Sequence, residues 1–249
     1  MTMIEQGNGP PLVLVPGLPG PWQFVAPAVQ TLSNRFRVLT FSLGPECTIA
    51  ADVARILEAL NERQIDRAVI CGISLGGLVA LRFAAEHPER TAALVLASAP
   101  GPGATLRPHH RAYTRWPWLC GPLFVLETPF RLRHETQWTL ARIKTLAVAT
   151  VRAPVSFAKI ARRAKLIEST DIAADCRRVT TPTLVITGEQ GLDDVVPVES
   201  TMKYVTAISS ATHVLMRGAG HLGPITHAIE FAAIVDDFVR RVAPRADVA

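Results

Sequence analysis

Short apolar runs alternate along most of the chain with longer segments in which apolar residues recur at helical spacing. The runs expected to form buried strands span residues 12–15, 38–42, 68–71, 93–97, 183–187 and 212–216. Helical patterns lie between them, for example at Val53, Ile56 and Leu60 within residues 49–63. This alternation predicts an α/β fold, with a mostly parallel sheet flanked by helices.

The alternation breaks between residues 101 and 178, where no strand pattern is present. This segment begins after a Pro-Gly-Pro-Gly run at residues 100–103 and shows helical spacing of apolar residues around Phe157 and Ala161. Three of the four tryptophans fall in it: Trp116, Trp118 and Trp138. We therefore expect a core of residues 1–100 and 179–249, interrupted by a helical lid of residues 101–178.

Length and composition fit a single large domain with an insert. The chain has 249 residues, of which 49% are hydrophobic, so it can bury a sizeable core and is not expected to be disordered. No apolar run approaches the roughly 18 residues of a membrane-spanning helix. The first residues lack the basic start of a signal peptide, and a cytoplasmic protein is expected.

The positive charge of the chain is concentrated in the insert. Residues 101–178 hold 14 Lys or Arg and 5 Asp or Glu, a net charge of +9, whereas the rest of the chain carries −4. Arg162-Arg163 and Arg177-Arg178 are only doublets, and on helices most such side chains would point to solvent. A solvated lid surface is thus favoured over attraction of an anionic substrate. Nucleic-acid binding ranks third, and no nucleic-acid partner is expected.

The four cysteines give no support to a metal site or a disulfide framework, because they are far apart and form no C-x-x-C pair. They are Cys47, Cys71, Cys120 and Cys176. Cys71 lies within an apolar run and is expected to behave as a small core residue. We expect neither a metal nor another cofactor.

A G-x-S-x-G motif at residues 72–76 follows one predicted strand and precedes a helix. In that context the motif indicates a nucleophile elbow, a sharp turn that exposes the hydroxyl of Ser74 at the carboxyl edge of the sheet. The flanking Gly72 and Gly76 would permit a strained backbone that larger neighbours would not. The alternative is a glycine-rich turn in which Ser74 only caps the helix.

A nucleophilic serine needs a base, and the base needs an acid that orients it. Among seven histidines, His221 is placed best, in a glycine-flanked loop directly after the last strand. The acid is expected in the loop after the strand at 183–187, where Glu189, Asp193 and Asp194 are all candidates. Among the three, Asp193 is distinguished by its position four residues before Pro197.

The order Ser74, Asp193, His221 resembles that of the α/β-hydrolase superfamily, and the similarity covers nearly the whole chain. In that family the acid often occurs in a G-x-x-D-x-x-x-P pattern. Gly188, Asp193 and Pro197 match this pattern, with two extra residues after the glycine. The resemblance implies a sheet of about six or seven strands with a short or missing first edge, and a lid at the position of the insert.

The resemblance also implies an oxyanion hole made by two backbone N–H groups. One follows the nucleophile and the other lies in the loop after an early strand; by position these belong to Leu75 and Leu18. The early loop commonly begins His-Gly in the family, whereas this chain has Pro16-Gly17. A backbone donor survives that change, although any role of the histidine side chain is lost.

These residues predict a serine hydrolase that cleaves a carboxylic ester, lactone or related acyl bond through an acyl-enzyme. C–C bond hydrolysis and acyl transfer by the same triad are alternatives, because the pocket decides between them. A non-catalytic member of the fold that binds a small ligand is a further one. The expected partner is a small acyl substrate, and the sequence gives no signal of oligomeric state.

Overall fold

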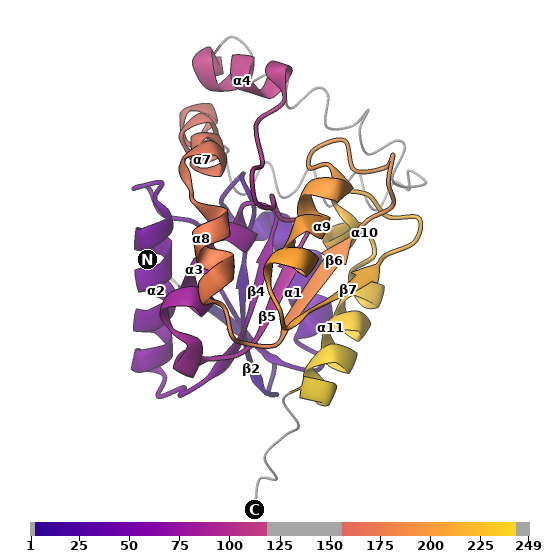
Figure 1. Ribbon diagram of the computed structural model, residues 1–249. Helices are drawn as coiled ribbons and strands as arrows, with labels where there is room; N and C mark the ends of the chain where they lie inside the picture. The colour runs from indigo at the N-terminus through magenta and orange to yellow at the C-terminus, as the bar shows by residue number, and fades with distance from the viewer. Residues whose placement is uncertain (1–2, 119–155, 243–249) are drawn as a thin grey trace, which may run out of the picture.

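The computed structural model describes residues 3–118 and 156–242, which form a seven-stranded sheet covered by helices (Figure 1). The strand order is β1-β3-β2-β4-β5-β6-β7, and every neighbouring pair is parallel except β1 with β3. The strands are Ile4–Gln6 (β1), Pro11–Val15 (β2), Arg37–Thr40 (β3), Ala68–Ile73 (β4), Thr91–Ala97 (β5), Thr183–Thr187 (β6) and Ala211–Leu215 (β7).

All six strands expected from the apolar runs are present, each within two residues of its predicted ends. The seventh, β1, is the short edge that the family resemblance implied. It has three residues and pairs antiparallel with β3, from Ile4 opposite Thr40 to Gln6 opposite Val38. Two of its three side chains are exposed, so it lacks the buried apolar run that identified the other strands.

Helices bury both faces of the sheet. One face is covered by Ala26–Leu32 (α1) and Ala228–Val242 (α11), and the other by Ile49–Glu62 (α2), Gly76–Glu86 (α3), Ile172–Arg178 (α8) and Val198–Ala207 (α9). Short helical turns occur at Trp22–Val25 (η1), Pro88–Arg90 (η2) and Gly223–Thr226 (α10). In β2, Leu12 and Leu14 pack with α1 and α11, whereas Val13 and Val15 pack on the opposite face.

The described parts of residues 101–178 are helical and contain no strand. They include Pro108–Arg115 (α4) and Phe157–Ser169 (α7), which pack together at the upper end of the molecule in Figure 1. Helix α8 lies lower, against α3, with Ile172 and Cys176 in the apolar core. Cys120 and Trp138, both noted in the sequence, lie outside the described residues.

No helix within residues 3–118 and 156–242 has the length and apolarity to cross a bilayer.

Candidate active site

Ser74 lies at the sharp turn between β4 and α3, with a φ of +54°. A Cβ atom at Gly72 would approach the Gly76 carbonyl oxygen to 2.3 Å, and one at Gly76 would approach that of Val15 to 2.3 Å. Only glycine fits at both positions, because backbone oxygens cannot move aside. The G-x-S-x-G motif therefore folds into the strained strand-to-helix turn predicted for it, with the Ser74 N–H donating to the Ala97 oxygen at 2.9 Å.

His221 follows β7 and reaches Ser74 from the adjacent part of the sheet edge. Its Nε2 lies 3.0 Å from the Ser74 Oγ. The loop that carries it is joined to the loop after β6, because the Glu189 N–H donates to the Ala219 oxygen at 2.8 Å. Gly188 permits this approach, since a Cβ there would lie 2.3 Å from the same oxygen.

Asp193 holds the other side of the imidazole. Its Oδ2 lies 3.1 Å from the His221 Nδ1, and its Oδ1 accepts from the N–H groups of Val195 at 3.0 Å and Val196 at 2.8 Å. Both side chains are buried, with exposed fractions of 3% for Asp193 and 7% for His221. An ionised carboxylate only accepts hydrogen bonds, so this contact assigns the proton to Nδ1 and leaves Nε2 to accept from Ser74.

Of the three acids that the sequence left open, the structure brings Asp193 to His221. Asp194 is exposed, and Glu189 lies at the start of the turn that holds the two extra residues. That turn is closed by the Leu192 N–H donating to the Glu189 oxygen at 3.1 Å. Gly191 has a φ of +91° there and is open to solvent. The two extra residues therefore lie in a turn that bulges toward solvent, and Asp193 still contacts His221.

Another histidine, His213, lies in β7. Its Nε2 lies 2.8 Å from the Thr187 Oγ1, and burial lowers its pKa. It thus belongs to the pairing of β6 with β7 rather than to the turn at Ser74. His134 lies outside the described residues.

The two residues expected to supply the oxyanion hole, Leu75 and Leu18, belong to chain segments next to Ser74. Leu75 directly precedes α3, where N–H groups of the first turn have no partner within the helix. Leu18 lies in the loop after β2, next to Gly17. A Cβ at Gly17 would lie 3.2 Å from the Ser74 Cβ, so this loop passes directly against the serine.

The described cysteines Cys47, Cys71 and Cys176 are buried and free. Burial raises the pKa of Cys71 far above its usual range, and that of Cys176 to about 12. Both thiols therefore stay protonated at neutral pH, which makes them poor nucleophiles and poor metal ligands. Within the described ranges, no three His, Cys, Asp or Glu residues are grouped as a metal site would require.

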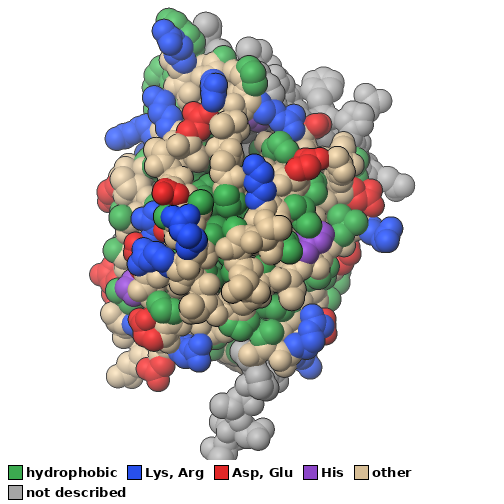
Figure 2. All heavy atoms as spheres, viewed as in Figure 1, with side chains coloured by type: hydrophobic (Ala, Val, Ile, Leu, Met, Phe, Trp, Pro, Cys, Tyr) green, Lys and Arg blue, Asp and Glu red, His purple; other side chains and the backbone are tan. Residues whose placement is uncertain are grey.

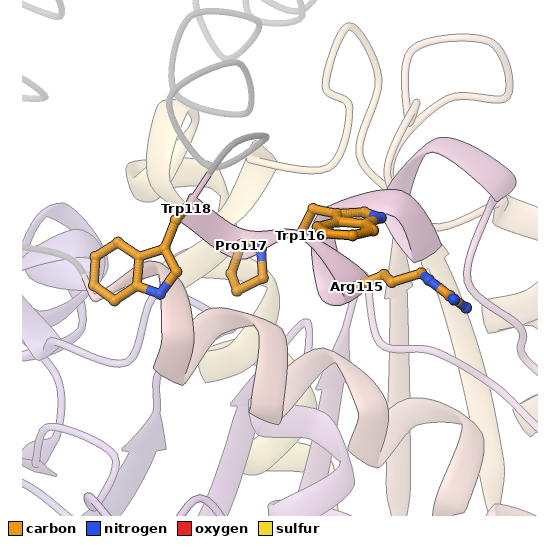
Figure 3. Close-up of a pocket in the computed structure, with 4 residues that line it drawn as sticks. All are labelled: Arg115, Trp116, Pro117 and Trp118. Carbon is orange, nitrogen blue, oxygen red and sulfur yellow. The ribbon is translucent and has the colours of Figure 1, made fainter.

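A shallow hollow of about 190 Å³ lies at the end of α4 and is lined by Arg115, Trp116, Pro117 and Trp118. Figure 3 shows the two indole rings on opposite sides of Pro117. Trp116 and Trp118 are 58% and 76% exposed. The residues that line the hollow do not include Ser74, His221 or Asp193, so it is separate from the candidate active site.

Residues 12–234 match the Alpha/beta hydrolase family, and the chain belongs to it. A relative from Nitrosomonas europaea, pimeloyl-[acyl-carrier protein] methyl ester esterase, is 28% identical over 92% of this chain and 96% of its own. A Pseudomonas syringae pv. syringae protein named for carbamate hydrolysis, RutD, is 27% identical over 94% and 95%. The chain is thus an α/β-fold hydrolase.

Solved structures agree on the fold. An enol-lactonase from Burkholderia xenovorans superposes with a TM-score of 0.77 at 24% identity, over 96% of this chain and 95% of that one. An esterase from Exiguobacterium antarcticum gives 0.81 at 17% identity, over 96% and 94%. At such identities the likeness concerns the backbone architecture alone.

Proposed function

We propose that the protein is a serine hydrolase of carboxylic esters or lactones, with Ser74 as nucleophile, His221 as base and Asp193 as the orienting acid. The observation that carries the proposal is the hydrogen-bond chain from Ser74 Oγ through His221 to Asp193, with separations of 3.0 and 3.1 Å. Nucleophile and base within hydrogen-bond reach, with the base held by a third group, is the arrangement that acyl transfer needs.

In the acylation step, Ser74 Oγ attacks the substrate carbonyl carbon while His221 Nε2 accepts its proton. The carbonyl oxygen becomes an oxyanion, which the N–H groups of Leu18 and Leu75 would stabilise. When the tetrahedral intermediate collapses, the carbon–oxygen bond to the leaving group breaks. His221 then returns the proton to the departing alkoxide, and the acyl group stays on Ser74.

Deacylation repeats these steps with water as the nucleophile. His221 accepts a proton from water, and the resulting oxygen attacks the acyl carbon. When the second intermediate collapses, the bond from that carbon to Ser74 Oγ breaks, His221 returns the proton to Oγ, and the free acid leaves. The buried carboxylate of Asp193 stabilises the imidazolium that forms in each half of the cycle. Its two backbone N–H donors keep that carboxylate oriented toward the Nδ1 atom.

The curated relatives support a carbonyl substrate, because their names refer to a methyl ester and to a carbamate. Both bonds are cleaved by attack on a carbonyl carbon, which is the chemistry proposed for Ser74. C–C bond hydrolysis and acyl transfer to an alcohol would use the same three residues. A panel of p-nitrophenyl esters, lactones and carbamates, with an added alcohol as competing acceptor, separates these reactions by their products.

Replacement of the nucleophile tests the proposal most directly. Ser74→Ala should lower kcat at least ~10⁴-fold and abolish covalent labelling by a fluorophosphonate probe, since the attacking oxygen is gone. Ser209→Ala, at an exposed serine after α9, is the matched control and should keep both signals. Labelling that persists in Ser74→Ala would refute the assignment of the nucleophile.

The charge of the insert bears on the kind of acyl substrate. Several Lys and Arg side chains lie on the upper part of the molecule, around α4 and α7, with acidic side chains among them (Figure 2). Arg111 and Arg115 of α4 and the N-cap Arg107 have no acidic residue in the same helix, and Arg111 pairs with Glu168 of α7 at 2.7 Å. We infer that a negatively charged substrate approaches faster than its neutral analogue. Including a carboxylated ester in the panel, at low and high salt, tests this; equal salt dependence for both substrates would contradict it.

A further inference from the structure

Arg163 is buried although it carries a full positive charge. It lies on the inner face of α7, with 4% of its surface exposed, whereas its neighbour Arg162 is exposed. The sequence predicts that most side chains of the arginine doublets point to solvent, as Arg162, Arg177 and Arg178 do, and Arg163 is the exception. A buried charge is costly unless it is hydrogen-bonded. Nη1 and Nη2 of Arg163 have carbonyl partners, whereas its buried Nε has no hydrogen-bond partner among the described residues.

The guanidinium of Arg163 binds carbonyl oxygens from two loops of the core. Nη1 donates to the Pro19 oxygen at 2.9 Å, with the Leu18 oxygen at 3.5 Å. Nη2 donates to the Leu43 oxygen at 2.9 Å and to that of Gly44 at 3.2 Å. These loops follow β2 and β3, so a side chain of the insert bridges two neighbouring loops at the carboxyl edge of the sheet. A planar fork of donors suits this geometry, and a lysine could not reproduce it.

The loop after β2 is shaped around this guanidinium. Gly20 has a φ of +96°, and a Cβ there would lie 2.0 Å from the Arg163 Nη1. Its N–H donates to the Gly17 oxygen at 3.0 Å, and its own oxygen accepts from the Leu43 N–H at 2.9 Å. Only glycine combines this backbone conformation with so close an approach.

A buried carboxylate contacts the second of these loops, the one after β3. Asp52 is 4% exposed, and its Oδ1 accepts from the Gly44 N–H at 3.0 Å and from the Arg55 Nη1 at 2.9 Å. Burial lowers the pKa of Arg163, while the neighbouring Cys47 and Asp52 act in the opposite direction. The positive charge is therefore held in the interior by carbonyl dipoles and a nearby carboxylate, not by solvent.

We propose that Arg163 is a positioning residue that keeps the Leu18 peptide N–H directed at the carbonyl oxygen of a substrate on Ser74. The proposal rests on the proposed serine-hydrolase function. Hydrogen bonds engage the carbonyls of Gly17 and Pro19, on either side of Leu18, and Gly17 packs against Ser74. With its neighbours fixed in this way, the Leu18 peptide has little freedom to rotate. The insert thus contributes to oxyanion stabilisation from a distance, through one side chain.

The test compares Arg163→Met, which has similar length but no hydrogen-bond donors, with Arg163→Lys and with Arg162→Met as the matched control. On a neutral ester, Arg163→Met should lower kcat about 10- to 100-fold with KM nearly unchanged, because a misplaced oxyanion donor acts on the transition state. Arg163→Lys should fall between it and wild type, and Arg162→Met should match wild type. Millimolar guanidinium chloride, but not sodium chloride, should restore part of kcat to Arg163→Ala.

Two outcomes would overturn the proposal: a kcat for folded Arg163→Met within twofold of Arg162→Met, or a loss confined to KM. Amide hydrogen exchange gives a readout independent of turnover, since Arg163→Met should speed exchange in residues 17–24 and 42–47 while Arg162→Met does not. If wild type and Ser74→Ala were equally inactive, the proposed function would fail. Exchange at these loops would still decide whether Arg163 fixes them, and unchanged exchange would refute that.

Discussion

The two sides of the candidate site are held in place by different kinds of interaction. Asp193 and His221 are fixed by the core itself: the loops after β6 and β7 bond to each other, and each side chain is hydrogen-bonded to its neighbour. The loop of Leu18 is joined to the core loop after β3 by the hydrogen bond from the Leu43 N–H to the Gly20 oxygen, and it is also held from outside the core by the guanidinium of Arg163 on α7. Helix α8 is also joined to the core by a charged contact. The side chain of Asp175 is 3% exposed and pairs with Arg82 of α3 at 2.7 Å.

This contrast concerns how residues 101–178, the predicted insert, are joined to the sheet and its covering helices. The core is stabilised by apolar packing on both faces of the sheet and by ladders of backbone hydrogen bonds. The predicted insert contacts that core partly through a few buried charged side chains, whose hydrogen bonds form only at defined positions and orientations. Such contacts are specific, and removal of one partner leaves the other unsatisfied in the interior.

A large loss of activity is expected when Asp193, on the side of the site that the core holds, is replaced by an uncharged residue. Asp193→Asn keeps the size of the side chain but puts an amide where His221 needs an acceptor, which favours the wrong imidazole tautomer. We expect kcat to fall about 10³- to 10⁴-fold, with little change in thermal stability. Steady-state kinetics on the best ester of the panel measure this loss.

Asp194→Asn provides the matched control, because Asp194 is exposed and adjacent in the chain. It should retain activity within a factor of about two, since exposed substitutions away from such contacts have small effects. Equal losses of kcat in the two variants would contradict the assignment of Asp193 as the acid. Its hydrogen bond to His221 would then not explain the loss.

The same contrast explains which features the sequence could predict. The strands, the turn at Ser74 and the loop of His221 have local signatures: apolar periodicity, G-x-S-x-G and flanking glycines. For the acid, the family pattern favoured Asp193 and left Glu189 and Asp194 open. The sequence alone does not encode that the two extra residues lie in an exposed turn at Gly191 and that Asp193 contacts His221. The role of Arg163 had no local signal either, since a buried arginine and a solvated one look alike in a charged helix.

The attachment of the insert can be tested at α8. Asp175→Asn removes the carboxylate that pairs with Arg82 and leaves that guanidinium without its buried partner. Breaking a buried pair costs about 3–5 kcal/mol, and the partial exposure of Arg82 should reduce this to about 2 kcal/mol of unfolding free energy. Urea unfolding measures the loss.

Asp171→Asn is the control for the same change of charge on the same helix. Asp171 is the N-cap of α8 and accepts from the Ala174 N–H at 2.9 Å, a role that asparagine fills equally well. Its effect should stay within about 0.5 kcal/mol. If Asp175→Asn destabilised the protein no more than Asp171→Asn does, the buried pair would not contribute to holding α8 on the core.

The smallest effect is expected for Asp236 of α11, which pairs with Arg240 on the same helix and with Arg35 in the turn after α1. Burial alone would raise the pKa of Asp236, but hydrogen bonds from Arg240 and Arg35 outweigh it and lower the pKa below its ordinary value. A carboxyl with a lowered pKa stabilises the fold above its unfolded pKa of about 3.9, and this contribution is lost as the pH falls through the folded value. Both arginines are largely exposed, so the gain at neutral pH should be no more than about 1 kcal/mol.

Asp236→Asn should therefore be slightly less stable than wild type at pH 7 and approach it below pH ~4, in urea titrations repeated across that range. Asp237→Asn, at an exposed pair with Arg241 on the same helix, should show a smaller difference at pH 7. A gap between wild type and Asp236→Asn that stayed constant down to the lowest pH would show that the carboxylate charge is not its cause.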